Sequence, residues 1–269
     1  MGKSTPWTQP GRYVALGDSF TEGVGDEMLG GWVRGWADLV AGVLSERWLR
    51  EDPAGERTGY ANLAVRGKLL GAIIDEQLDP ALELHPDLIT FAGGGNDMLR
   101  PRTDTLTLLR LIDLTVARMT DSGATVVMFT GADPCDGLPM GARIRTSGNR
   151  LAAGARTIAD RRGALLVDLW PIEELRHPGY WASDRLHLNE IGHQQVAGRV
   201  LDVLRVERPA HWTAPIVFPA LSPRTARNEL DFYWEYVGPW VRRRLTGTSS
   251  GDRRPPKRPL LAPFTEQLG

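Results

Sequence analysis

The sequence predicts an α/β fold in which helices cover both faces of a parallel sheet. Five short apolar runs alternate with amphipathic stretches over residues 1–206. Each run is apolar at successive positions, which is typical of strands that are buried on both faces. Because crossovers between parallel strands are right-handed, the pattern favours a flavodoxin-like, three-layer fold with a five-stranded sheet of order 2-1-3-4-5. In such sheets the functional site lies at the carboxyl ends of the strands.

The expected elements follow one another in a regular order. The helical stretches carry apolar residues at spacings of three and four, and Gly, Pro, Asp or Ser residues separate them from the strands. We expect strands over residues 13–16, 60–64, 87–92, 124–130 and 164–169. We expect helices over residues 32–48, 69–84, 106–119, 149–162 and 190–204.

The composition changes after Val206. Residues 207–245 are rich in Pro and aromatic residues, and we expect this extension to pack on the core, because exposed apolar faces promote aggregation. Its docked helical face is predicted from apolar residues at spacings of three and four: Leu230, Trp234, Val237, Val241 and Leu245. Residues 246–269 are basic and Pro-rich, which predicts a disordered tail. The predicted division of the chain is therefore 1–206, 207–245 and 246–269.

The composition also excludes several classes of protein. The chain has 269 residues and a formal net charge of −1, so nothing global indicates a nucleic-acid partner. Cys135 is the one cysteine, which excludes a disulfide scaffold. No apolar run approaches the roughly 20 residues that are needed to span a bilayer. Because the first ten residues lack the apolar segment of a signal peptide, we expect a cytoplasmic protein.

Two polar segments carry residues suited to catalysis. Gly17-Asp18-Ser19-Phe20 follows the first strand at once, so Ser19 is held on a rigid element beside the backbone N–H groups of the next turn. Asp184 and His187 lie three residues apart before the last helix, where one tight turn brings a carboxylate to an imidazole. Taken alone, the first segment also fits an ordinary helix-capping turn, and the second fits a solvated surface turn.

Two glycine-containing segments end the second and third strands. Gly93-Gly94-Gly95-Asn96-Asp97 follows the third strand, where glycines let the chain approach a ligand and Asn96 offers an amide donor. Residues 62–67 end the second strand, and Gly67 offers a free backbone N–H. Taken alone, residues 93–97 also fit a glycine-rich turn, and residues 62–67 carry almost no information about function.

Together the four segments resemble the SGNH (GDSL-type) hydrolase family, whose four blocks occur in this order. Residues 17–20 match the first block, with Phe20 where many members have Leu. Gly67, residues 94–97 and residues 184–187 match the other three blocks. The resemblance covers about residues 12–205 and leaves the remainder of the chain unexplained.

The resemblance implies an esterase or acylhydrolase. Ser19 would be the nucleophile, His187 the base that accepts its proton, and Asp184 the acid that orients the base. The N–H groups of Ser19 and Gly67 and the side chain of Asn96 would form the oxyanion hole. Because no plausible metal-ligating cluster accompanies this set, we expect neither a metal nor another cofactor.

The substrate is expected to be a small ester, with short-chain acyl esters and O-acetyl groups of carbohydrates as the first candidates. Phe20, Met98 and Leu99 are expected to border it. Thioesterase and lysophospholipase-like activities are alternatives within the same chemistry. A second class of function is a non-catalytic protein that binds an anionic surface through its basic C-terminal tail.

Overall fold

The computed structural model describes residues 11–100, 103–138, 141–218, 225–239, 242, 246 and 249–264 of the chain. Within these ranges six strands form one sheet in the order β5-β4-β3-β1-β2-β6. β1 to β5 run parallel, and β6 pairs antiparallel with β2. The predicted three-layer fold and strand order are therefore confirmed, with one strand added beyond β2. The strands are β1 (Arg12–Leu16), β2 (Gly59–Asn62), β3 (Leu88–Phe91), β4 (Thr125–Thr130), β5 (Leu165–Asp168) and β6 (Arg258–Ala262).

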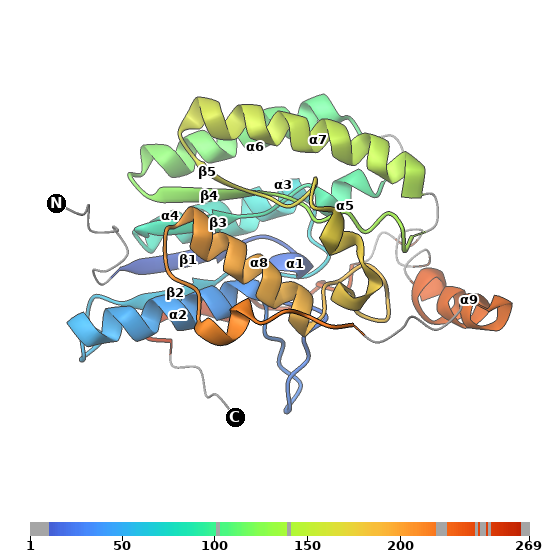
Figure 1. The fold of residues 1–269 in the computed structure, drawn as a ribbon. Coiled ribbons are helices and arrows are strands. Elements are labelled where there is room, and N and C mark those ends of the chain that lie inside the picture. The colour runs from blue at the N-terminus through green and yellow to red at the C-terminus, as the bar shows by residue number, and fades with distance from the viewer. Residues whose placement is uncertain are drawn as a thin grey trace.

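Long helices cover both faces of the sheet (Figure 1). One layer contains α2 (Trp36–Glu51) and α8 (Glu190–Val203), and the other contains α6 (Thr105–Asp121) and α7 (Gly141–Arg162). Successive β1 residues belong to opposite clusters: Tyr13 packs in the cluster of α2 and α8, and Val14 packs in the cluster of α6 and α7. This alternation explains why the strands are apolar at every position.

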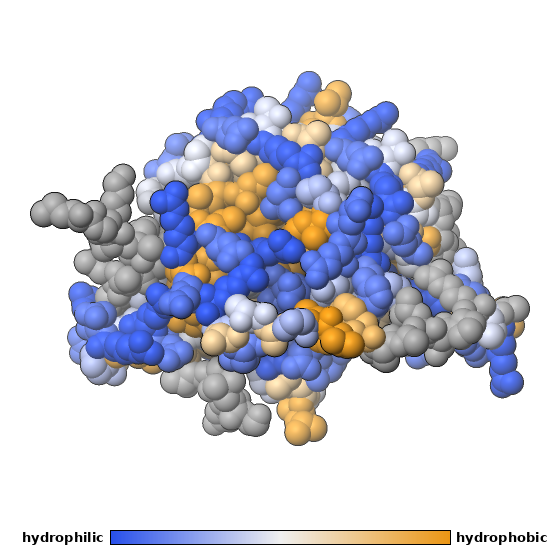
Figure 2. Space-filling model, in the orientation of Figure 1, coloured by the Kyte–Doolittle hydropathy of each residue, from blue (hydrophilic) through white to orange (hydrophobic). Residues whose placement is uncertain are grey.

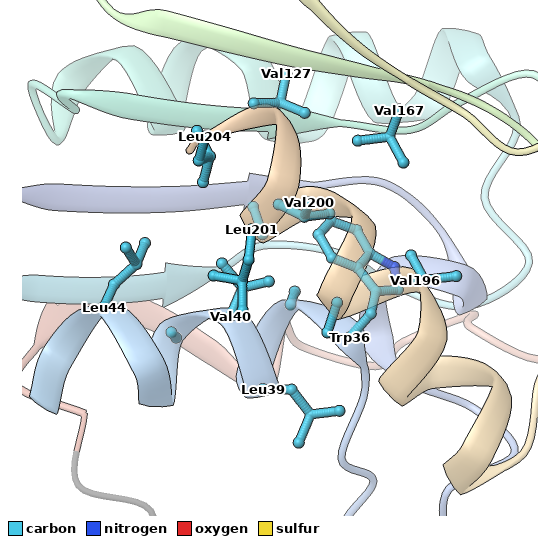
Figure 3. Packing of buried hydrophobic residues seen from close by; sticks show 14 of the residues in the cluster. Trp36, Leu39, Val40, Leu44, Val127, Val167, Val196, Val200, Leu201 and Leu204 are labelled. Atoms are coloured by element: carbon cyan, nitrogen blue, oxygen red, sulfur yellow. The ribbon is translucent and has the colours of Figure 1, made fainter. Parts of the chain in front are cut away.

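Figure 3 shows how α2 and α8 are fixed against the sheet. Trp36 and Val40 of α2 meet Val196 and Val200 of α8, and all four side chains are fully buried. The Trp36 ring also lies 4.6 Å from the ring of Phe129, measured between centroids. Because α2 and α8 each begin close to the strand ends, this packing sets the position of the loops that precede them.

The segment predicted as one helix over residues 69–84 contains three successive helical pieces. α3 (Leu70–Ile73), a π-helical turn (Ile74–Leu78) and α4 (Asp79–Glu83) follow one another without a break. Pro80 lies in the first turn of α4, where its missing N–H is tolerated, and the wider π turn precedes it. Other short helices that the sequence did not predict are α1 (Ser19–Glu22), α5 (Gly95–Met98) and the 3-10 turns Glu173–Arg176, Pro178–Tyr180 and Ala210–Thr213.

The extension docks through a different helical face from the one that was predicted. It contains α9 (Ala226–Phe232) and a π-helical turn (Tyr233–Val237). Phe232 is buried, whereas Leu230 and Trp234 are 59% and 76% exposed, so the predicted docked face is wrong. Val241 and Leu245, which complete that face, lie outside the described residues. Polar contacts to residues 183–185 select the docked side instead, as described below.

The prediction of a disordered tail is wrong for the part that forms β6. An edge strand such as β2 presents unpaired N–H and C=O groups, and β6 pairs with them. Phe264 is buried just beyond β6, with its ring 5.2 Å from that of Tyr60, and the Arg258 guanidinium lies 4.5 Å from the Phe264 ring. Residues 247–248 and 265–269 of this tail lie outside the described ranges. The division at residues 206 and 245 remains a prediction.

Charged and polar side chains cover most of the face in Figure 2. An apolar tip projects below this face, where the loop between α1 and α2 projects in Figure 1, and Leu29 in this loop is 98% exposed. Across the described ranges, no helix combines the length and apolar character that crossing a bilayer requires.

Candidate active site

Ser19 opens the short helix α1, three residues after the end of β1. The Asp18 carboxylate caps this helix by accepting a hydrogen bond from the Phe20 N–H at 3.1 Å. Gly17 makes the sharp turn possible, because a Cβ there would lie 2.8 Å from the carbonyl oxygen of Ala92. The buried Gln77 side chain then holds Gly17 on both sides, accepting from its N–H and donating to its carbonyl oxygen. Ser19 is thus fixed at the carboxyl end of the sheet.

Asp184 and His187 are held together by a tight turn before α8. One Asp184 oxygen accepts from the backbone N–H groups of Leu186 and His187, and the other lies 2.5 Å from His187 Nδ1. Burial by itself raises the pKa of Asp184, but the hydrogen bond and charge of His187 and the two backbone donors outweigh it, so the net shift is downward. The carboxylate therefore stays ionised and holds the proton on Nδ1, which leaves Nε2 as the proton acceptor.

The acid–base turn packs directly against the segment that follows α1. A Cβ on Gly25 would lie 3.2 Å from the His187 Cβ and 2.1 Å from the Leu188 carbonyl oxygen, so only glycine fits there. His193 of α8 fastens this contact, because its Nε2 lies 3.2 Å from the Val24 carbonyl oxygen and its Nδ1 accepts from the Trp36 N–H. Burial lowers the pKa of His193 to about 3, so its ring is neutral and holds the backbone at Val24 and Trp36 through these two hydrogen bonds.

Gly67 and Asn96 lie at the same carboxyl end of the sheet, after β2 and β3. Gly67 has a φ of +75°, which strains any residue with a Cβ. Asn96 lies in α5, and its Nδ2 donates to Asp18 Oδ2 at 3.1 Å and to the Lys68 carbonyl oxygen at 3.0 Å. The amide of Asn96 therefore ties the segment before Ser19 to the loop after Gly67.

Asp18 is the most perturbed carboxylate of this group. Burial raises its pKa to about 6, although the Phe20 N–H and the charge of His187 oppose the shift and the charge of Asp97 adds to it. The same carboxylate caps α1 and accepts from Asn96. Its protonation state is thus coupled to the geometry of both segments.

An apolar cavity of about 100 Å³ opens beside Asp18. Two of the residues predicted to border the substrate, Phe20 and Met98, line it, whereas Leu99 does not. Most of the remaining wall comes from β3, β4, α6 and α7: Phe91, Met128, Phe129, Ile112, Leu151, Ala152 and Ala155, with Trp170 after β5.

The sequence did not indicate a second group of residues that support the site. Glu22, the last residue of α1, accepts from the Arg66 backbone N–H at 2.6 Å and from the Arg66 guanidinium at 2.8 and 2.5 Å. Arg66 directly precedes Gly67, so Glu22 joins α1 to the loop of Gly67. A carboxylate and an arginine 44 residues apart carry no local signal of this pairing.

Among the described residues, no group of three or more His, Cys, Asp or Glu side chains could hold a metal ion. Cys135 is buried, and burial raises its pKa above the ordinary thiol value, so it is a weak nucleophile. The five residues predicted for catalysis and the oxyanion hole lie near the carboxyl ends of the strands, as do Phe20 and Met98. These five are Ser19, Gly67, Asn96, Asp184 and His187.

Comparison with known proteins agrees with this geometry. The sequence profile of the GDSL-like lipase/acylhydrolase family matches residues 15–195. No curated protein sequence matches the chain.

Several solved structures share the fold of the matched part. LAE5, an α/β hydrolase from the metagenome of Lake Arreo, Spain, is 24% identical with a TM-score of 0.56, over 72% of this chain and 95% of LAE5. A catalytic mutant of Axe2, an acetylxylan esterase from Geobacillus stearothermophilus, is 18% identical with a TM-score of 0.58, over 77% and 97% of the two chains. TesA is 20% identical with a TM-score of 0.54, over 72% and 98%.

Proposed function

The chain belongs to the GDSL-like lipase/acylhydrolase family and is a hydrolase of ester bonds, and we propose that it cleaves short-chain acyl esters through an acyl-serine intermediate. The observation that supports the proposal is the Asp184–His187 pair, which packs against Gly25 in the segment that follows the helix of Ser19. A serine hydroxyl is a poor nucleophile until an adjacent imidazole accepts its proton, and this pair supplies such an imidazole.

In the proposed reaction the Ser19 Oγ attacks the ester carbonyl carbon while its proton passes to His187 Nε2. The tetrahedral intermediate then collapses, and the leaving alcohol takes the proton from His187. Water attacks the acyl-serine with the same base, releasing the acid and restoring Ser19. Asp184 stabilises the imidazolium in both halves, because its ionised carboxylate lies 2.5 Å from Nδ1.

Three donors are proposed to stabilise the oxyanion: the N–H groups of Ser19 and Gly67 and the Asn96 amide. Within the part of the chain that the structure describes, neither backbone N–H donates to another protein group. Both hydrogens of Asn96 Nδ2 already have acceptors, Asp18 and the Lys68 carbonyl. Asn96 would therefore exchange one of these acceptors for the oxyanion as charge develops there.

The apolar cavity supports a short acyl chain. Its volume of about 100 Å³ is below the roughly 150 Å³ of a buried cavity that accepts benzene. An acetyl to butyryl group is of that size, and the similar structures include an acetylxylan esterase, so O-acetylated carbohydrates are a natural first panel.

Hydrolysis of p-nitrophenyl esters from acetate to octanoate tests the proposal. Ser19→Ala should lower turnover by roughly 10³-fold or more, because the nucleophile acts as a unit with its base. Ser45→Ala is the matched control, since Ser45 is a buried serine of α2. Addition of EDTA should leave the rate unchanged. A Ser19→Ala variant that kept most of the activity would refute the assignment.

The acyl site is tested by changing the wall of the cavity. Leu151→Ala should move the preferred ester toward longer acyl chains, because it enlarges the cavity. Leu109→Ala is the control: Leu109 packs against Gly154 between α6 and α7 and does not line the cavity. Equal chain-length profiles for the two variants would place the acyl group elsewhere.

A further inference from the structure

The C-terminal strap, residues 249–264, lies outside the part of the chain that matches the family. We propose that this strap fixes the position of α1 relative to the Gly67 loop, and that Lys257 is the residue that positions them. The proposal rests on the proposed function, in which Ser19 and Gly67 act on the same substrate.

Lys257 reaches from the strap to the end of α1. Its Nζ donates to the Glu22 carbonyl oxygen at 2.5 Å and to the Val33 carbonyl oxygen at 3.1 Å. Its third partner is Asp38 Oδ2 at 2.5 Å, on a carboxylate that is almost fully buried in the first turn of α2. One ammonium group therefore fixes the end of α1, the end of the following loop and the start of α2.

The end of α1 is in turn joined to the Gly67 loop. The Glu22 carboxylate binds both the backbone N–H and the guanidinium of Arg66, as described above. Lys257 holds the backbone of Glu22, and Glu22 holds the backbone of Arg66. A shift of α1 would therefore move the Gly67 N–H relative to Ser19.

The strap also touches the Gly67 loop directly. A Cβ on Gly67 would lie 2.2 Å from Ser249 Oγ, and a Cβ on Gly251 would lie 2.0 Å from the Arg66 carbonyl oxygen. These close approaches place residues 249–251 of the strap against the Gly67 loop. The loop thus lies between α1, through Glu22, and the strap.

Stability alone is a weak explanation for Lys257. A buried ion pair such as Lys257–Asp38 loses much of its attraction to desolvation, and an apolar pair of similar volume is often as stable. The anchoring of the strap comes instead from its pairing with β2 and from the burial of Phe264. The ammonium group instead fixes the relative positions of three segments, because one acceptor from each segment binds the same nitrogen atom.

Lys257→Met is the decisive variant, because Met keeps the length and apolar volume and removes the three donors. Arg258→Met is the matched control: Arg258 is the next residue of the strap, and its guanidinium stacks on the Phe264 ring. Active sites are counted by titration with a phosphonate inhibitor, so that rates refer to folded enzyme. Lys257→Met should lower kcat per site by roughly 10- to 100-fold with little change in KM, as expected for a small misplacement of reacting groups. Arg258→Met should retain the wild-type kcat per site.

Equal kcat values per site for the two variants would overturn the proposal, while an inactive wild-type enzyme would overturn the proposed function. Hydrogen exchange separates these cases without using activity. Lys257→Met should speed amide exchange in residues 19–23 and 65–68, and Arg258→Met should speed it only in β6 and β2. If exchange in residues 19–23 and 65–68 is the same in both variants, Lys257 does not position them.

Discussion

The two sides of the proposed active site are held by different kinds of contact. On the nucleophile side, Ser19 is 9% exposed, and the buried groups Gln77, Asn62 and His193 hold the backbone around it. On the side of Asp184 and His187, these side chains are 24% and 20% exposed, and their turn is held by its own hydrogen bonds, by the packing of Gly25 and by the extension.

The contact with α9 is made at a strained position. Arg185, between the acid and the base, has a φ of +56°, which is unfavourable for a residue with a Cβ. Its guanidinium pairs with Glu229 at 2.8 and 3.0 Å and lies 3.9 Å from the Phe232 ring, and the Tyr236 hydroxyl donates to Ser183 Oγ. The proposed nucleophile is thus held by buried groups of the core, whereas the turn of the proposed base is also supported by the extension.

The largest effect should come from the acid–base pair itself. We expect His187→Ala to lower kcat/KM by roughly 10³-fold or more, since no proton acceptor is left for Ser19. Asp184→Asn should cost about 10-fold less, because the ring remains but its orientation and charge support are weakened. Steady-state kinetics on p-nitrophenyl acetate measures both. Equal losses would show that Asp184 does more than orient the ring.

On the nucleophile side, Asn96→Ala should lower kcat by about 10²-fold and leave KM nearly unchanged, because the donor serves the developing oxyanion. Asn62→Ala is a useful comparison, since Asn62 bonds the Thr21 carbonyl oxygen and Tyr60 and should act mainly on stability. A large rise in KM with a normal kcat would make Asn96 a residue that binds the ground state.

A smaller effect is expected from the support of the acid–base turn. Glu229→Ala should lower kcat by roughly 3- to 10-fold, since Arg185 loses its bidentate partner and the turn can relax. Glu235→Ala, an exposed glutamate of the same segment, should leave kcat unchanged. If both variants behaved alike, the comparison between the two sides would fail, because the base would not depend on α9.

The remaining expected effect is on stability rather than on rate, and it comes from Asp18. Because burial raises its pKa from 3.8 to about 6, the folded protein binds more protons than the unfolded chain between these values. The free energy of unfolding should therefore decrease as the pH rises from about 4 to about 6, by up to about 3 kcal/mol from this group. Asp18→Asn removes this decrease, so the unfolding free energy of the variant should rise relative to that of the wild type as the pH increases from about 4 to about 6.

His193 contributes with the opposite sign, because its pKa is lowered from 6.5 to about 3 and stability is lost as the pH falls through that window. The wild type and Asp18→Asn both keep His193, so the difference between their unfolding free energies, measured in urea, isolates the contribution of Asp18. Parallel pH profiles for wild type and Asp18→Asn would contradict the raised pKa.

Local patterns in the sequence were sufficient to predict the five parallel strands and the motifs at their carboxyl ends. The strand order, Ser19 after β1 and the Asp184–His187 turn all follow from residues that are close in sequence. The support of the site does not. Lys257 and Glu22 are 235 residues apart, so no local pattern connects them. The segment around β6 is polar and Pro-rich, and β6 becomes a strand because it pairs with the edge strand β2. The docked face of α9 was missed because Arg185 and Glu229 select it, rather than the apolar stripe.

The pairing of β6 with β2 also has a consequence for biosynthesis. At typical translation rates of about 5–20 residues per second, the 196 residues from Asn62 of β2 to Arg258 of β6 take roughly ten to forty seconds to emerge. During that interval the first five strands can assemble, while β2 remains an open edge that can pair with another nascent chain. The same contact that aligns the finished site therefore closes an aggregation-prone edge, and a ribosome that pauses before residue 258 prolongs the exposure.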